Sequence, residues 1–156
     1  IAMAVASALE YHDREKMIED ALSVEEYAMN LGASTPSPSL GARTKLGILL
    51  AQTYANDETA FLENIYNVIG AGVNTSESVP AALAIAYYSF DVRKCALLCA
   101  NLGGDTDTIG GAAQGLSEIP EKDIALIQKS NQIDFTKYAD AIIKKRGQIK
   151  WEKDVS

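Results

Sequence analysis

The stretch LGGDTDTIGG at residues 102–111 concentrates more side-chain oxygens next to glycine than any other part of the chain. Gly103 and Gly104 can adopt the positive φ values that end a helix. Asp105 or Thr106 can then cap the next helix by accepting a hydrogen bond from an N–H of its first turn. The pattern therefore predicts a tight turn between two helices, and we expect the remaining helices to hold this turn in place.

Two carboxylates at such a junction, those of Asp105 and Asp107, repel each other unless a positive charge lies between them. The helix dipole relieves a small part of this repulsion. A hard divalent cation relieves far more, because Mg²⁺, Mn²⁺ and Ca²⁺ prefer carboxylate, hydroxyl and water oxygens. Thr108 adds a hydroxyl one residue further on. The pattern is compatible with a metal site, and equally with an acidic helix start that binds no ion.

Residues 103–110, GGDTDTIG, resemble the signature of the ADP-ribosylglycohydrolase family, which includes the dinitrogenase-reductase-activating glycohydrolases. Residues 77–84, ESVPAALA, are similar to the segment that precedes this signature in the family. The resemblance implies an all-α, multi-helix bundle with a pair of Mg²⁺ or Mn²⁺ ions. It also implies hydrolysis of the N- or O-glycosidic bond between the anomeric carbon of ADP-ribose and its acceptor.

The resemblance also suggests roles for individual residues of the turn. The two aspartates and the following threonine of the family correspond to Asp105, Asp107 and Thr108, which are therefore the expected metal ligands. Backbone N–H groups at a glycine-rich turn can bind a diphosphate, so we assign substrate binding to Gly104 and Thr106. No catalytic residue is assigned. The expected partner is an ADP-ribosylated protein or a small molecule that resembles ADP-ribose.

The chain departs from the family pattern at two places. The first residues, Ile1–Leu9, begin inside what looks like a buried helix. The Thr-Asp-Asp run, which the resemblance implies as the source of the remaining metal ligands, is absent. We expect residues 1–146 to form the C-terminal portion of a single domain, incomplete at its N-terminus, with residues 147–156 as a tail. The missing N-terminal half of the same fold is then an expected partner. The helix after Gly111 is also shorter than the family pattern by about ten residues, or roughly 15 Å.

Two other functions are compatible with these residues. A non-catalytic helical module could keep the aspartate turn as a structural cap or as half of a metal site. A metal-dependent phosphoester hydrolase could use the same oxygen ligands. Nucleophilic catalysis with a histidine base has little support, because the single histidine, His12, lies on a predicted surface turn far in sequence from the aspartates.

Composition limits the class of protein. The 156 residues are 47% hydrophobic and 22% charged, which is ordinary for a soluble globular domain. A net charge of −7 argues against a broad nucleic-acid surface. No apolar run approaches the roughly 18–20 residues of a membrane span. With two cysteines that are not expected to form a disulfide, we expect a cytoplasmic location. Cys95 and Cys99 are expected to pack as small core residues on one helix.

Apolar residues recur at helical spacing along most of the chain, and no stretch alternates as a strand would. Polar loops are expected at 32–39, which could line a substrate cleft, and at 74–78. Ser23 and Glu26 could form a capping box that splits the first long helix. The predicted helices with two stated ends are 14–30, 40–54, 59–69, 121–130 and 133–146. Asp13 is expected to cap the first of these, and the helix 59–69 is expected to point Phe61, Leu62, Ile65, Val68 and Ile69 inward. Two further helices are expected between residues 78 and 102: one ends at Tyr88 and has Pro80 in its first turn, and the other is capped by Asp91.

Overall fold

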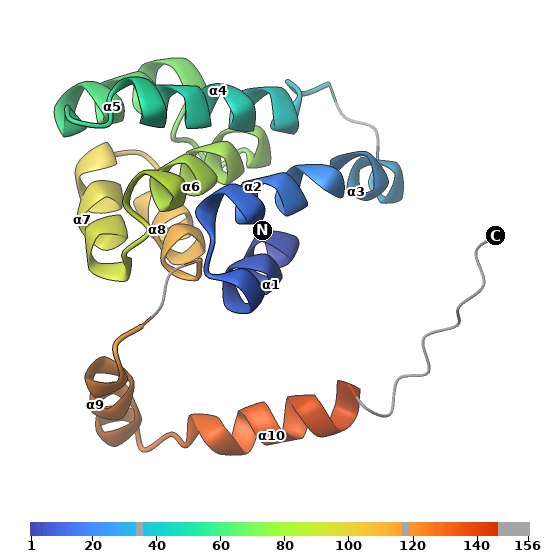
Figure 1. Ribbon diagram of the computed structural model, residues 1–156, viewed down its shortest axis with the longest axis vertical. Coiled ribbons are helices and arrows are strands. Elements are labelled where there is room, and N and C mark those ends of the chain that lie inside the picture. Colours follow the sequence, from blue (N-terminus) through green and yellow to red (C-terminus); the bar gives the residue numbers. More distant parts are fainter. Residues whose placement is uncertain (34–35, 117–118, 147–156) are drawn as a thin grey trace. The chain divides into compact units, whose positions relative to one another are not determined.

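The computed structural model describes residues 1–33, 36–116 and 119–146. In these ranges every regular element is helical and there is no strand, which confirms the all-α class (Figure 1). The chain divides into two compact units, residues 1–118 and 119–156. The first unit contains α1 (Ala2–Tyr11), α2 (Arg14–Ser23), α3 (Glu25–Leu31), α4 (Leu40–Thr53), α5 (Glu58–Asn64), the π-helical segment η1 (Ile65–Ile69), α6 (Thr75–Ser89), α7 (Val92–Leu102) and α8 (Thr106–Gln114).

Helix α6 is the centre of the first unit. It contacts α2, α4, α7, α8 and η1, and residues 80–87 are all buried. Four of these eight residues are alanines, so the helix is thin. Gly47 on α4 faces this surface, because a Cβ placed on it would lie 2.9 Å from the Cβ of Ala84. Small side chains on both helices therefore let α4 and α6 approach closely.

Helix α6 begins earlier than its sequence indicated. It starts at Thr75, so the predicted polar loop at 74–78 is wrong and Pro80 lies inside the helix rather than in its first turn. Proline has no N–H, so the carbonyl four residues earlier, that of Ser76, loses its usual donor. Arg43 on α4 replaces this donor, because its Nη1 lies 3.0 Å from the Ser76 carbonyl oxygen. A tertiary contact thus makes a proline acceptable in the central helix.

The segment predicted as one helix at 59–69 is an α-helix that widens into a π-helix. Phe61, Ile65 and Ile69 are buried as predicted, and the ring of Phe61 stacks on Tyr88 with a centroid distance of 4.2 Å. Val68, also predicted to point inward, is 48% exposed. The wider turn of η1 changes the angle between successive side chains, so the spacing of a regular α-helix no longer identifies the buried face.

The first long helix is split, but not by a capping box. Asp13 caps α2 as predicted, since its carboxylate accepts hydrogen bonds from the N–H groups of Glu15 and Lys16. The chain bends at Val24, and α3 starts without a side-chain cap. Ser23, the expected capping residue, donates its hydroxyl to the carbonyl of Asp20 instead.

The second unit contains α9 (Glu121–Asn131) and α10 (Phe135–Arg146), close to the predicted ranges. Four large apolar residues of α10 are exposed: Phe135, Tyr138, Ile142 and Ile143. Residues 147–156, including Trp151, lie outside the described residues, so the predicted tail is not described. The assignment of residues 1–146 to a single domain stays a prediction. None of the described helices is both long and apolar enough to cross a bilayer.

The contact between Arg43 and Ser76 predicts that substitutions of Arg43 and of Pro80 have non-additive effects on the free energy of unfolding. Arg43→Met should lower the free energy of unfolding in urea by about 1 kcal/mol, because it leaves the Ser76 carbonyl without a donor. Lys45→Met, an exposed change on the same helix, should alter it by less than about 0.5 kcal/mol. In a Pro80→Ala background the cost of Arg43→Met should shrink, because Ala at position 80 supplies the missing N–H. Strictly additive effects would contradict this role of Arg43.

Candidate functional site

The aspartate turn, residues 103–108, joins α7 to α8. Asp91 fixes the start of α7 by accepting a hydrogen bond from the N–H of Lys94 at 2.7 Å, as predicted. Gly103 and Gly104 end the helix with φ values of 83° and 74°, in agreement with the positive φ values predicted for them. Helix α8 then begins at Thr106. The turn therefore delivers both aspartates at the N-terminal end of a helix.

The turn rests on the loop between η1 and α6. The N–H of Asp105 donates to the carbonyl of Ala71 at 2.7 Å. A Cβ placed on Gly104 would lie 2.1 Å from the same carbonyl oxygen, far inside van der Waals contact. Gly104 is therefore required both for its positive φ and for this close approach of two backbone segments.

Glu77 holds the other side of this contact. Its carboxylate accepts a hydrogen bond from the N–H of Gly72 at 2.9 Å, and a Cβ on Gly70 or Gly72 would lie 2.7 Å from the same carboxylate oxygen. Glu77 thus connects the first turn of α6 to the loop on which Asp105 rests. No role was predicted for Glu77 from the sequence, although this residue belongs to the stretch that resembles the family and follows the two glycines closely.

The two aspartates lie together, but not as the sequence predicted. Asp105 occupies the position before α8, yet its side chain caps no backbone N–H, and neither does that of Thr106, which is the first helical residue. The carboxylate of Asp105 instead accepts a hydrogen bond from the hydroxyl of Thr108 at 3.0 Å. A hydrogen bond with Asp105, followed by the backbone N–H groups of Thr108 and of Asp107 itself, lowers the pKa of the Asp107 carboxyl.

This arrangement suits a hard cation but supplies only part of its ligands. Two carboxylates and a hydroxyl come together in sequence at the start of α8, from Asp105, Asp107 and Thr108. Asp105 is half-buried, and the other two residues are exposed. These are the oxygen donors that Mg²⁺ and Mn²⁺ prefer. In the part of the chain that the structure describes, no three His, Cys, Asp or Glu side chains form a group that could hold a metal. The metal assignment, and that of substrate binding to Gly104 and Thr106, stay predictions.

Other residues with reactive side chains lie elsewhere. His12 is exposed at the C-terminal end of α1 with a φ of 51°, as expected of a surface turn. Cys95 and Cys99 are both buried, in agreement with the predicted core positions. Burial raises the pKa of the Cys99 thiol to about 12, so this thiol is not a nucleophile at neutral pH.

A cavity of about 440 Å³ lies at the start of α6, where Glu77 is one of its lining residues. Its walls include Pro36, Ser37 and Pro38 from the loop that was predicted to line a substrate cleft. Among the described residues that line it, Arg43 is the one cation; these residues are Pro36, Ser37, Pro38, Arg43, Asn74, Thr75, Ser76 and Glu77. The structure therefore joins the predicted cleft loop to the helix that supports the aspartate turn.

The close approach at Gly104 predicts a large effect of a single methyl group. Gly104→Ala should lower the free energy of unfolding by at least about 2 kcal/mol. The alanine would be held at a positive φ, which is unfavourable for a residue with a Cβ, and this Cβ would clash with the Ala71 carbonyl. Gly111→Ala is the matched control in α8, where a Cβ meets nothing within 4 Å. It should stabilise the protein by about 0.5–1 kcal/mol through helix propensity. Equal effects of the two variants in urea unfolding would exclude the proposed contact.

Comparisons with known proteins found two matches that each extend over almost the whole chain. The ADP-ribosylglycohydrolase family matches residues 1–150. A relative described as the uncharacterized protein YegU of Escherichia coli (strain K12) is 37% identical over 156 residues. The match covers 95% of this chain and 46% of YegU, so the chain spans less than half the length of that relative. No solved structure matches. Because the family match extends over nearly the whole chain and includes the aspartate turn, the chain belongs to the ADP-ribosylglycohydrolase family.

Proposed function

We propose that the chain is part of a metal-dependent hydrolase that cleaves the glycosidic bond between ADP-ribose and a protein side chain or small acceptor. The observation that carries this proposal is the aspartate turn, which places Asp105 and Asp107 at the N-terminal end of α8, with the Asp105 carboxylate accepting a hydrogen bond from the Thr108 hydroxyl at 3.0 Å. Membership of the ADP-ribosylglycohydrolase family supports the reaction class.

Asp105, Asp107 and Thr108 would hold one or both of two Mg²⁺ or Mn²⁺ ions. A bound divalent ion lowers the pKa of a coordinated water and orients oxygen atoms of the substrate. The remaining ligands would come from outside the described residues, among which no third acidic group joins these two. The stretch 36–116 would then provide one wall of a larger metal centre, consistent with the greater length of YegU.

The carboxylates of the turn have a second role in this proposal. Cleavage of a glycosidic bond builds positive charge on the sugar ring as the leaving group departs. Negative charge fixed next to the ring favours that state over the neutral ground state. Because Asp105 and Asp107 lie on a turn anchored to Ala71, their charges are positioned before the substrate binds.

The cavity at the start of α6 is the proposed position of the substrate phosphates. The N-terminal end of a 15-residue helix attracts anions through its free N–H groups and its dipole. Arg43 adds a guanidinium, of which the structure uses Nη1 for the Ser76 carbonyl. The remaining N–H groups of Arg43 can donate to phosphate oxygens. Glu77, which also lines the cavity, is already bonded to the N–H of Gly72.

The second candidate is a non-catalytic helical module. The observation that favours it is the absence of a third acidic ligand among the described residues. In this case the hydrogen bonds among Asp105, Asp107 and Thr108 would serve only to shape the turn.

Metal binding can be tested without turnover. In titrations with Mn²⁺ followed by electron paramagnetic resonance, Asp107→Asn should weaken binding by more than about tenfold, because it removes a charged ligand without changing side-chain size. Glu26→Gln, at an exposed position on α3, is the matched control and should bind as the unmodified chain does. Unchanged Mn²⁺ affinity in Asp107→Asn would rule out the assigned ligands.

Activity separates the two candidates. The hydrolase should release free ADP-ribose from a peptide carrying ADP-ribosylated arginine or serine, and this release should require Mg²⁺ and disappear in Asp107→Asn. Chromatography of the nucleotide products measures the reaction directly. If Mn²⁺ binds but no ADP-ribose is released by the protein in its full natural length, the non-catalytic module is the correct function.

A further inference from the structure

One peptide group, the one that joins Ala71 to Gly72, is held by hydrogen bonds at both of its ends. Its N–H donates to the carboxylate of Glu77 at 2.9 Å. Its carbonyl oxygen accepts from the N–H of Asp105 at 2.7 Å. A chain of hydrogen bonds therefore runs from α6, through the loop before it, to the first aspartate of the turn.

The planarity of the peptide group makes these two hydrogen bonds depend on each other. The N–H and the C=O of a trans peptide lie in one plane and point in opposite directions. Whatever fixes the direction of the Gly72 N–H therefore also fixes the direction of the Ala71 carbonyl. A charged acceptor on the N–H also polarises the peptide, which makes its carbonyl a stronger acceptor for Asp105.

Gly72 cannot fix this orientation by itself. A residue without a Cβ adopts negative and positive φ values about equally well, so the peptide before Gly72 can turn over at little cost. In the turned-over orientation the Ala71 carbonyl would point away from Asp105. Glu77 fits closely against this loop, since a Cβ on Gly70 or Gly72 would lie 2.7 Å from its Oε2. The glycines thus make room for a side chain that selects the peptide orientation.

The position of Glu77 in α6 explains why its carboxylate reaches this peptide. Glu77 is the third residue of the helix, where a glutamate commonly turns back to accept an N–H that precedes the first turn. Here it reaches past Asn74, the residue before the helix, to Gly72. Its negative charge is also favourable at the positive end of the helix dipole.

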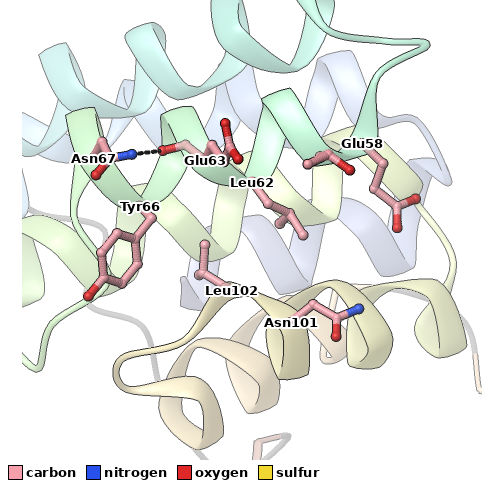
Figure 2. Close-up of a pocket in the computed structure, with 8 residues that line it drawn as sticks. Glu58, Leu62, Glu63, Tyr66, Asn67, Asn101 and Leu102 are labelled. Carbon is pink, nitrogen blue, oxygen red and sulfur yellow. Dashed lines mark hydrogen bonds between the residues drawn. The ribbon is translucent and has the colours of Figure 1, made fainter.

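A further contact of the turn cannot replace this chain of hydrogen bonds. Tyr66 on η1 lines the pocket between α5, η1 and the end of α7 (Figure 2), and its Cε2 lies 3.6 Å from where a Cβ on Gly103 would be. The ring of Tyr66 is 51% exposed. A van der Waals contact of this kind limits the space around Gly103, but it has no direction and does not orient the N–H of Asp105.

We propose that Glu77 is the positioning residue of the aspartate turn. Its carboxylate orients the peptide between Ala71 and Gly72, and this peptide holds Asp105 in the geometry that binds a metal. Glu77 acts through the acceptor oxygen of its side chain and does not itself touch the metal. The effect on the metal rests on the proposed function, whereas the effect on the turn does not.

The first test follows hydrogen exchange at the Asp105 amide in ¹H–¹⁵N spectra of the metal-free protein in its full natural length. Glu77→Ala should speed this exchange by about fivefold, because the Ala71 carbonyl is no longer held towards Asp105. Glu77→Gln should change it by less than about twofold, because the side-chain oxygen of glutamine still accepts the Gly72 N–H. Unchanged exchange in Glu77→Ala would overturn the proposal.

The second test measures the Mn²⁺ affinity of the same variants by electron paramagnetic resonance. Glu77→Ala should weaken binding by about tenfold, which is typical when a group that orients a metal ligand is removed. Glu77→Gln should restore the affinity to within about twofold of the unmodified protein, because it keeps the acceptor oxygen. If Glu77 were itself a ligand, Glu77→Gln would lose Mn²⁺ as Asp107→Asn does, and this outcome would contradict the positioning role.

Asp13→Ala is the control for a general loss of stability, because it removes the side-chain cap of α2. It should leave both the Asp105 exchange and the Mn²⁺ affinity unchanged. An equal loss of Mn²⁺ affinity in Asp13→Ala would overturn the proposal, since Glu77 would then act only through stability. If the unmodified protein binds no Mn²⁺, the proposed function fails, and the exchange at Asp105 alone decides the role of Glu77.

Discussion

The hydrogen bond from the N–H of Asp105 to the carbonyl of Ala71 joins the two backbone segments on which the site depends. One segment carries the aspartates, and the other leads into the central helix α6. They can come within 2.7 Å only because Gly104 has no Cβ and accepts a positive φ. Glu77 holds the second segment from the opposite side through the N–H of Gly72. The position of the acidic pair is thus set by backbone contacts before any ligand binds.

The central helix provides the rigid support for these contacts. Its alanines allow α4 to pack closely, and the close packing places Arg43 beside the carbonyl that Pro80 leaves without a donor. The same arginine lines the cavity at the start of α6. A residue that stabilises the fold therefore also supplies the positive charge at a candidate phosphate site. Sites built on helices in this way hold their side chains more accurately than sites on free loops.

Much of the local structure followed from short-range chemistry. Asp13, Asp57 and Asp91 cap helices because a carboxylate next to a first turn accepts its free N–H groups, and this requires no distant part of the chain. The predictions that were wrong share a different cause. The start of α6 depends on Arg43, which is 33 residues from Ser76. The exposure of Val68 depends on a π-helical turn, which apolar spacing alone does not reveal.

The all-α class, the glycine turn after α7, the acidic pair and the family could all be predicted from the sequence, because each depends on residues that are neighbours along the chain. The packing of the helices was needed to show that Asp105 is held by Ala71 and bonded to Thr108 rather than used as a helix cap. It also decided that Glu77 supports the turn and that Tyr66 lies against Gly103. These contacts join segments that are far apart along the chain, so they exist only once the helices have packed around α6.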